Sequence, residues 1–311
     1  MEAYWASNLK SRLIAAALLL SANTAQAATL TVPFDFSRGE IGIDVSVKGA
    51  PLHVILDTGV DPSAIDTTRA EALDLALDRE NGGEASGEGD DKTALVFPVA
   101  IQSLTIAGYG FGDIDALAID MTGMSKQYGK QLDGVLGYSF LTNKITLIDY
   151  PGRTLTFADA PVEVISSVRQ CRVRYTVPLK WDGEETIPII GDFQIGPAQG
   201  PISLDTGSNA AISLYPAGLA LPGMRDALIE KGEVTYSGAR GTSTAKSYVL
   251  NGSVAFGPFS LPRGQAIKVI KGTGAPESRI ANIGNRLFAD MKLKMLLDYR
   301  NRLITFYGGC R

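Results

Sequence analysis

Histidine and cysteine are scarce in this chain of 311 residues, which has one histidine, His53, and two cysteines, Cys171 and Cys310. A single histidine excludes zinc sites that are built from several histidines. A Ser-His-Asp mechanism would have to use His53, and the sequence has no Gly-x-Ser-x-Gly segment to hold the serine. Glycine-rich segments that bind phosphates or dinucleotides are also missing. We therefore expect no cofactor and no metal, and we expect His53 to be an ordinary strand residue.

The chain also has no excess of basic residues. Its 29 lysines and arginines stand against 33 aspartates and glutamates, for a net charge of −4. This balance gives no basic footprint for nucleic acid. Hydrophobic residues make up 45% of the chain, which is typical of a soluble protein with a substantial core. The length is sufficient for two domains of ordinary size.

The N-terminal segment has the pattern of an export signal. Lys10 and Arg12 precede an apolar run over residues 13–20, and Ala25-Gln26-Ala27 forms a small-x-small cleavage site. The run is shorter than the roughly 20 residues of a spanning helix. We therefore predict a signal peptide over residues 1–27, a periplasmic or secreted protein, and no membrane span after its removal. The alternative is that the signal is retained as an anchor.

The two cysteines are an even pair in a chain that we expect to be exported. Such a pair favours one disulfide between Cys171 and Cys310. The alternative is two separate buried thiols.

Two short segments of the chain are near copies of each other. Val54-Ile55-Leu56-Asp57-Thr58-Gly59 is repeated as Ile202-Ser203-Leu204-Asp205-Thr206-Gly207, and Ser208 follows the second copy. Each copy has a downstream partner, Gly134-Val135-Leu136-Gly137 or Ala281-Asn282-Ile283-Gly284. The interval from Asp57 to Gly137 is 80 positions, and that from Asp205 to Gly284 is 79. We interpret the chain as a duplicated unit with one carboxylate on a tight turn in each copy.

These paired motifs resemble those of the pepsin and retropepsin clan of aspartic proteases. The later Leu-Ile-Asp149-Tyr150 and Leu-Leu-Asp298-Tyr299 segments are most similar to the bacterial relatives of retropepsins. The resemblance covers about 270 residues. It implies a mostly β, two-lobed acid-protease fold with a pseudo-twofold axis, in which each lobe is a retropepsin-like β-barrel. It also implies a monomeric aspartic endopeptidase that acts on peptides or proteins.

The resemblance also assigns the site residues. Asp57 and Asp205 would form the catalytic pair. The supporting residues of the two active-site loops would be Thr58, Gly59, Thr206, Gly207 and Ser208. Two carboxylates a few ångströms apart cannot both ionise, so they share one proton. One can then act on water as a base while the other acts as an acid, and the sequence does not decide between them. A silent peptide-binding protein and a structural envelope component are the alternative functions.

The same reading divides the chain into an N-terminal lobe over residues 28–157, a linker over 158–170 and a C-terminal lobe over 171–311. Alternation and β-branched residues predict strands over residues 41–47, 154–157 and 303–306. Helices are predicted over residues 67–79 and 224–231. Residues 81–91 are rich in glycine and acid, and they form either a solvated loop or the tip of a flap over the cleft. Residues 237–241 would be the matching hairpin turn.

Two features depart from pepsin. Val60 follows the first Asp-Thr-Gly, whereas Ser208 follows the second, and residues 81–95 contain no flap tyrosine. A hydroxyl at the first position can stabilise an ionised carboxylate. We therefore expect Val60 to give a pH optimum above that of gastric pepsin.

Overall fold

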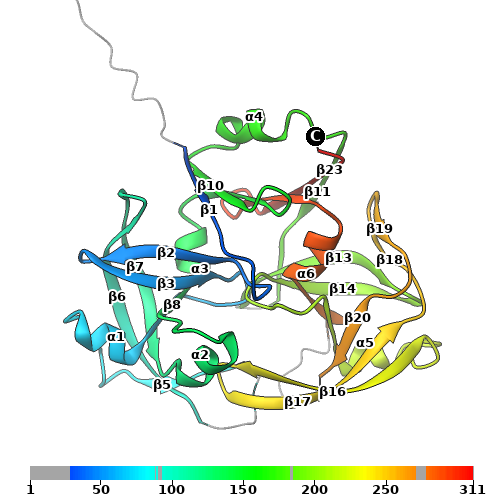
Figure 1. The fold of residues 1–311 in the computed structure, drawn as a ribbon, viewed down its shortest axis with the longest axis horizontal. Helices are drawn as coiled ribbons and strands as arrows, with labels where there is room; N and C mark the ends of the chain where they lie inside the picture. The colour runs from blue at the N-terminus through cyan, green and yellow to red at the C-terminus, as the bar shows by residue number, and fades with distance from the viewer. Residues whose placement is uncertain (1–28, 88, 90–92, 183–184, 271–277, 311) are drawn as a thin grey trace, which may run out of the picture.

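The computed structural model describes residues 29–310 except 88, 90–92, 183–184 and 271–277. The predicted signal peptide over residues 1–27 lies outside the described residues. The fold is mostly β and has three sheets (Figure 1). Two sheets belong to the two halves of the chain, and the third takes strands from both.

The first half forms a seven-stranded sheet in the order β2-β3-β8-β4-β7-β6-β5. A further pairing between Ser46 of β2 and Thr105 of β6 closes six of these strands into a ring. The expected barrel is therefore present in this half. The strands are β2 (Gly42–Val47), β3 (Ala50–Leu56), β4 (Ala64–Asp66), β5 (Gly83–Glu84), β6 (Leu95–Ile106), β7 (Tyr109–Ile119) and β8 (Gly134–Leu136). The helices are α1 (Thr67–Ala72), α2 (Thr122–Tyr128) and α3 (Tyr138–Leu141).

The second half forms a ten-stranded sheet in the order β16-β17-β20-β15-β21-β14-β13-β18-β19, with β12 beside β13. This path runs from β16 to β19 as an open sheet in the part of the chain that is described. The strands are β12 (Lys180–Asp182), β13 (Glu185–Ile195), β14 (Ala198–Asp205), β15 (Ile212–Leu214), β16 (Leu228–Gly238), β17 (Gly241–Leu250), β18 (Val254–Phe256), β19 (Phe259–Leu261), β20 (Ala266–Val269) and β21 (Ala281–Gly284). The helices are α5 (Pro216–Leu219) and α6 (Asn285–Asp290).

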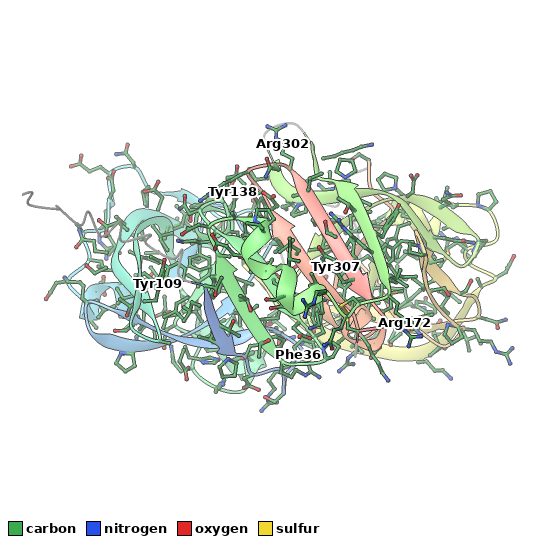
Figure 2. The ribbon with its side chains drawn as sticks, turned by 90° about the horizontal axis from the view of Figure 1, so that it is seen from above. Phe36, Tyr109, Tyr138, Arg172, Arg302 and Tyr307 are labelled. Carbon is green, nitrogen blue, oxygen red and sulfur yellow. A yellow bond between two sulfur atoms is a disulfide. The ribbon has the colours of Figure 1, made fainter. Side chains whose placement is uncertain are left out.

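The third sheet joins the two halves. Its order is β1-β10-β9-β22-β23-β11, and β9 pairs with β22 in antiparallel register, with Leu147 opposite Leu296. Its strands lie side by side across the middle of the molecule (Figure 2). They are β1 (Leu30–Pro33), β9 (Ile145–Asp149), β10 (Thr154–Ala158), β11 (Val173–Pro178), β22 (Lys294–Asp298) and β23 (Leu303–Gly308). The short helices η1 (Pro161–Val164) and α4 (Ile165–Val168) connect β10 to β11.

The disulfide between Cys171 and Cys310 is present. It closes the β11–β23 end of the joining sheet and packs against the buried residues of β9, η1 and α4. The expectation of a disulfide is therefore confirmed, and the alternative of two separate thiols is not.

The three predicted strands are confirmed as β2, β10 and β23, but the helix predictions are less accurate. The first helix, α1, begins after Asp66, whose carboxylate accepts from the Arg69 N–H, and it ends at Ala72. Asp74 then takes a left-handed φ of 51°, which stops the helix well before residue 79. The helix predicted over residues 224–231 is wrong. Met224 lies in a turn, and from Leu228 onward the chain pairs with β17 as a long hairpin, so tertiary pairing overrides the local pattern.

Among the described residues, no helix combines the length and the apolar character that crossing a membrane requires.

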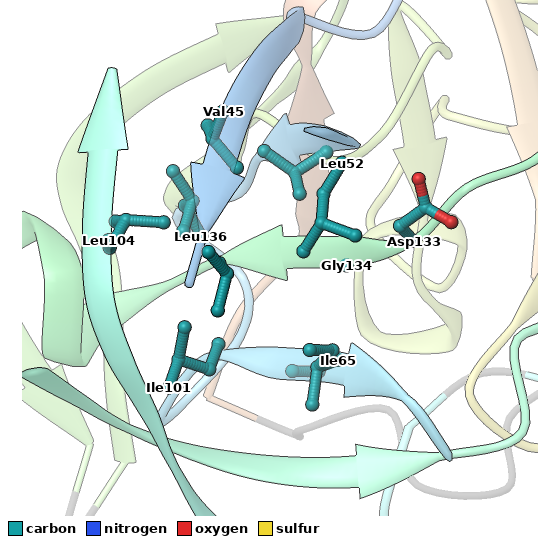
Figure 3. Close-up of a pocket in the computed structure, with 11 residues that line it drawn as sticks. Val45, Leu52, Ile65, Ile101, Leu104, Asp133, Gly134 and Leu136 are labelled. Atoms are coloured by element: carbon teal, nitrogen blue, oxygen red, sulfur yellow. The ribbon is translucent and has the colours of Figure 1, made fainter. Parts of the chain in front are cut away.

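The interior of the first half contains a cavity of about 10 Å³, lined by apolar side chains such as Leu52, Ile101 and Leu136, with Asp133 at its edge (Figure 3). That volume accommodates at most about one water molecule, so this cavity is a packing defect rather than a substrate site.

Candidate active site

The two Asp-Thr-Gly segments lie at the ends of equivalent buried strands. Asp57 follows β3, which runs parallel to β8, and Asp205 ends β14, which runs parallel to β21. The Asp57 N–H donates to the Leu136 carbonyl over 2.9 Å, and Asp205 is paired with Gly284. Each downstream segment that the sequence singled out therefore fixes the loop that carries the carboxylate.

Gly137 and Gly284 allow these segments to approach the loops closely. A Cβ on Gly137 would overlap the carbonyl oxygens of Val60 and Pro62. A Cβ on Gly284 would overlap those of Ser208 and Ala210. Both glycines are needed because no side chain fits between the strand end and the loop.

The two loops are cross-linked by their threonines. The Thr58 hydroxyl donates to the Leu204 carbonyl over 2.7 Å and accepts from the Thr206 N–H over 3.1 Å. In return, the Thr206 hydroxyl donates to the Leu56 carbonyl over 2.9 Å and accepts from the Thr58 N–H over 3.0 Å. All four bonds are buried. They bring together two loops that are 148 positions apart in the sequence.

The two carboxylates share this cross-linked centre. The Gly59 N–H donates to Asp57 Oδ1 over 2.6 Å. The Gly207 N–H lies 3.1 Å from Asp57 Oδ1 and 2.9 Å from Asp205 Oδ1, so one donor bridges the pair. A Cβ on Gly207 would overlap the Asp57 carboxylate, which explains the glycine. The structure thus brings together all seven sequence-predicted site residues.

Burial and the neighbouring charge both act on Asp57. Its side chain is buried, and desolvation raises its pKa well above the ordinary value. The negative charge of Asp205 and a hydrogen bond to it raise the pKa further, and the Gly59 and Gly207 N–H groups oppose the shift. Burial and the charge of Asp205 therefore both disfavour a negative charge on Asp57.

Asn282 is a site residue that sequence reasoning missed. Its side-chain amide donates to Asp205 Oδ2 over 2.6 Å, and the residue is buried. It lies two positions before Gly284, where the first copy has Val135 two positions before Gly137. Comparing the two downstream segments position by position would have revealed this difference, because an amide replaces an apolar side chain beside a carboxylate.

A second missed residue supports the centre from behind. The Asn285 amide donates to the Thr206 carbonyl, and the Tyr150 hydroxyl donates to Asn285 Oδ1 over 2.7 Å. Tyr150 comes from the first half and Asn285 begins α6 of the second. This chain of bonds adds a further link between the halves, directly behind the second loop.

The strand rows beside the two carboxylates differ in character. Cross-strand partners share a face of a sheet, so each row continues across four strands on the side of the carboxylate. Beside Asp57 the row is apolar, and it consists of Ile55, Val135, Ala64 and Leu117. Beside Asp205 the row is polar, and it consists of Ser203, Asn282, Ser213 and Lys268. We refer to them as the apolar row and the polar row.

The long β16–β17 hairpin of the second half reaches the first half. It turns between Gly238 and Gly241, which confirms the predicted turn, and α2 lies against both of its strands (Figure 1). Ala239 at the tip packs on the apolar cluster that includes Ile55 and Val135. Gly89 of the first half pairs with Arg240. The hairpin therefore covers the apolar row.

The glycine-rich segment over residues 81–91 contributes the short strand β5, in which Gly83 pairs with Val96. Its described residues up to 87 are mostly exposed. Glu88, Asp90 and Asp91 lie outside the described residues. The segment meets the tip of the opposite hairpin at Gly89, which favours the flap interpretation over that of an isolated solvated loop.

His53 lies within β3, as expected. One ring nitrogen contacts the Asp44 carboxylate at 2.8 Å, and the other contacts the Tyr128 hydroxyl at 3.1 Å. Val60 packs on the apolar cluster, whereas the Ser208 N–H donates to Asp205 Oδ1 over 3.0 Å.

The comparisons with known proteins concern the first half. Residues 43–140, about a third of the chain, match the family model described as aspartyl protease. The matched segment includes β3, the first Asp-Thr-Gly and the Gly134–Leu136 strand with Gly137. No curated protein matches the chain. Residues 43–140 are therefore similar to an aspartyl protease domain, a family whose name implies hydrolysis of peptide bonds.

Proposed function

We propose that this chain is an exported aspartic endopeptidase that uses Asp57 and Asp205 as its catalytic pair. The observation that carries the proposal is the shared centre. Two carboxylates from distant loops accept the same Gly207 N–H, and reciprocal threonine bonds hold the loops together. The aspartyl protease match over residues 43–140 supports the same reaction class.

The proposed chemistry needs no group other than the pair and a water molecule. One carboxylate removes a proton from water as the water oxygen attacks the peptide carbonyl, and the other carboxyl protonates the carbonyl oxygen. The rigid threonine cross-link keeps the two acids at a fixed separation during this exchange. The substrate is a peptide or protein.

The duplicated architecture is part of the proposal. The lobes would comprise residues 28–157 and 171–311, with residues 158–170 as the linker, and a pseudo-twofold axis would pass between the two loops. Equivalent strand pairings support this arrangement, because β3 with β8 and β4 corresponds to β14 with β21 and β15. The central β9–β22 pair supports it as well, since it joins the two Leu-x-Asp-Tyr segments.

Export is proposed on two observations. The first 27 residues have the pattern of a cleaved signal, and the Cys171–Cys310 disulfide is typical of an oxidising compartment. The proposed compartment is the periplasm or the exterior of the cell, and the proposed state is a monomer in which one chain supplies both carboxylates.

The test is cleavage of a mixed peptide library by the purified protein from about pH 3 to pH 7, read by mass spectrometry. Asp57→Asn and Asp205→Asn are assayed in parallel, and Asp113→Asn serves as the control because Asp113 is exposed on β7, where it accepts from the Ser103 N–H over 3.0 Å. Each loop variant is expected to lower the cleavage rate by at least about 10³-fold, as loss of an acid–base group does.

Each outcome of this test is informative. Cleavage that is lost in both loop variants and kept in Asp113→Asn supports the pair and gives the sequence preference from the same spectra. Correctly folded protein that cleaves nothing at any pH would favour the alternative of a silent peptide-binding protein. Cleavage that survives both substitutions would overturn the proposed pair.

A further inference from the structure

The hydrogen bonds around the two carboxylates are unequal. Asp205 accepts from three N–H donors, which are the backbone of Gly207 and Ser208 and the side chain of Asn282. Asp57 accepts from Gly59 and shares the Gly207 donor. Donors stabilise the charged form of a carboxylate, so the contacts favour a negative charge on Asp205.

The side-chain donor is the one that breaks the symmetry. Each carboxylate accepts from two backbone N–H groups, which are those of Gly207 and Ser208 for Asp205 and those of Gly59 and Gly207 for Asp57. Asn282 has no equivalent in the first half, where Val135 occupies the corresponding position in the apolar row. An ionised carboxylate can only accept, and the Nδ2 atom of Asn282 lies 2.6 Å from Asp205 Oδ2, which is the length of a strong donor contact.

The neighbours of Asn282 suit a polar role. It is paired on one side with Ser203 and on the other with Ser213. The Ser213 hydroxyl is buried, and no hydrogen-bond partner is described for it. Beyond it, the Lys268 ammonium lies 4.3 Å from the centre of the Tyr236 ring. Ser203, Asn282 and Ser213 are buried, and a buried polar group is costly unless it is hydrogen-bonded, as the Asn282 amide is to Asp205.

We propose that Asn282 is a positioning residue of the pair, whose amide keeps Asp205 as the carboxylate and leaves the shared proton on Asp57. This inference rests on the proposed function and deepens it by assigning the acid and the base. The apolar row contributes from the other side, because Ile55 and Val135 keep the surroundings of Asp57 unfavourable for a charge.

The assignment gives a balanced reaction. Asp205 takes a proton from water as the water oxygen bonds to the carbonyl carbon, and Asp57 gives its proton to the carbonyl oxygen, which yields a diol intermediate. The carbon–nitrogen bond then breaks. Asp205 gives its proton to the leaving nitrogen, and one hydroxyl of the diol returns a proton to Asp57. Each Oδ atom has two lone pairs, so Asp205 Oδ2 can bind water while it accepts from Asn282.

The first test measures the Asp205 carboxyl directly by ¹³C NMR of aspartate-labelled protein. In the Asp57→Asn background, Asp205 titrates without its partner. Adding Asn282→Val, which installs the first-half residue, is expected to raise the pKa of Asp205 by about one unit, a tenfold lower acid dissociation constant. Adding Asn143→Val to the same background is the matched control, because it removes an exposed side-chain amide that donates to the Ser139 carbonyl and not to either carboxylate, and no such rise is expected.

The second test uses peptide cleavage by the otherwise unchanged protein. Asn282→Val is expected to move the acidic limb of the kcat/KM profile up by about one pH unit and to lower kcat about tenfold with little change in KM. Asn143→Val is expected to leave the acidic limb in place. Asn282→Leu, which keeps the branching of asparagine at Cγ, repeats the measurement if the valine variant does not fold.

The two tests separate the inference from the proposed function. An unchanged Asp205 titration on loss of Asn282 would overturn the inference even if the protein cleaves peptides. If the protein cleaves nothing and the titration moves as expected, the proposed function fails, but Asn282 is still shown to hold the charge on Asp205. A cleavage profile whose acidic limb is the same in Asn282→Val as in the unchanged protein would overturn the catalytic assignment.

Discussion

The two halves have the same backbone plan at the site but different surroundings. Each half presents Asp-Thr-Gly at a strand end, closed by a glycine two residues after Val135 or Asn282. The row beside Asp57 is apolar throughout, and the row beside Asp205 is polar throughout. A duplicated unit can therefore keep the geometry that positions two acids while its strand rows diverge to give the acids separate roles.

Because the backbone at the site is the same in both halves, equivalent substitutions should change the free energy of unfolding equally. The largest change is expected at Gly137 and Gly284. Gly137→Ala and Gly284→Ala each force a Cβ into two backbone oxygens, so each is expected to lower the free energy of unfolding by about 3 kcal/mol or more. Urea denaturation measures the effect. Gly123→Ala in α2, where a Cβ meets nothing within 4 Å, is the control and should be neutral or stabilising. A large effect in one half alone would break the equivalence.

The contacts that cross between the halves are unequal, and one of them depends on pH. The Asn209 side chain, four positions after Asp205, is hydrogen-bonded to the buried Glu40 of the first half. The corresponding position in the first half is Asp61, four positions after Asp57. Its carboxylate accepts from the Thr186 hydroxyl of the second half over 2.7 Å, and this contact is exposed. Burial raises the pKa of Glu40 from 4.5 to about 7, despite the opposing effects of Asn209, Arg38 and Arg286.

The sign of the resulting pH dependence follows from proton binding. The folded protein binds the Glu40 proton more tightly than the unfolded chain, so the stabilisation is complete below about pH 4.5 and is lost as the pH rises through 7. The loss amounts to about 3 kcal/mol at most. Unfolding free energies measured from pH 4 to pH 8 should fall over this window, and Glu40→Gln should remove the part of the fall that Glu40 contributes, while the raised pKa of Asp57 acts in both proteins. The same slope in the Glu40→Gln variant would contradict this account.

The reciprocal threonine hydrogen bonds are a feature that both halves share. Thr58→Val and Thr206→Val each remove two buried hydrogen bonds and leave a carbonyl and an N–H unpaired. Each is expected to lower the free energy of unfolding by about 2 kcal/mol, with a double variant that is less than additive because the bonds are reciprocal. The Thr→Ser variants, which keep the hydroxyl, are the controls. A much larger loss of unfolding free energy at one threonine than at the other would mean that the hydrogen bonds of that threonine alone hold the two loops together.

The smallest effect concerns the bond behind the second loop. Tyr150→Phe removes the donor to Asn285 and is expected to lower the free energy of unfolding by about 1 kcal/mol. Its counterpart in the second half, Tyr299, meets the ring of Tyr138 edge-on at 5.6 Å instead. Thermal unfolding measures the change, and the reference is Tyr109→Phe, which removes a hydroxyl that, among the described residues, has only a long contact of 3.4 Å from Lys144 Nζ. An unchanged melting temperature in Tyr150→Phe would mean that Asn285 does not depend on this bond.

Much of the site could be predicted from the sequence because the duplication sets its geometry. Nearly equal intervals of 80 positions from Asp57 to Gly137 and 79 from Asp205 to Gly284 place each loop against its strand, and this needs no knowledge of side-chain contacts. The disulfide and the strands at the ends of each half followed from local pattern in the same way. The turn at residues 237–241 was predicted from its distance to the second Asp-Thr-Gly.

The rest depended on tertiary contacts that local pattern does not contain. The segment over residues 224–231 has helix-forming residues, yet Leu228 pairs with Leu250 in a hairpin. Asn282 and Asn285 were passed over because their roles depend on partners far away in the chain, Asp205 and Tyr150. The contact of Glu40 with Asn209 likewise joins residues 169 positions apart.

The most direct test of the account is the rate of peptide cleavage by Asp57→Asn and Asp205→Asn, each compared with the unchanged protein at its optimal pH. The central claim is that one site uses a carboxylate from each half. It predicts that either substitution alone lowers the rate by at least about 10³-fold while the protein stays folded. Full cleavage after loss of either carboxylate would show that a single half suffices, and it would contradict the account.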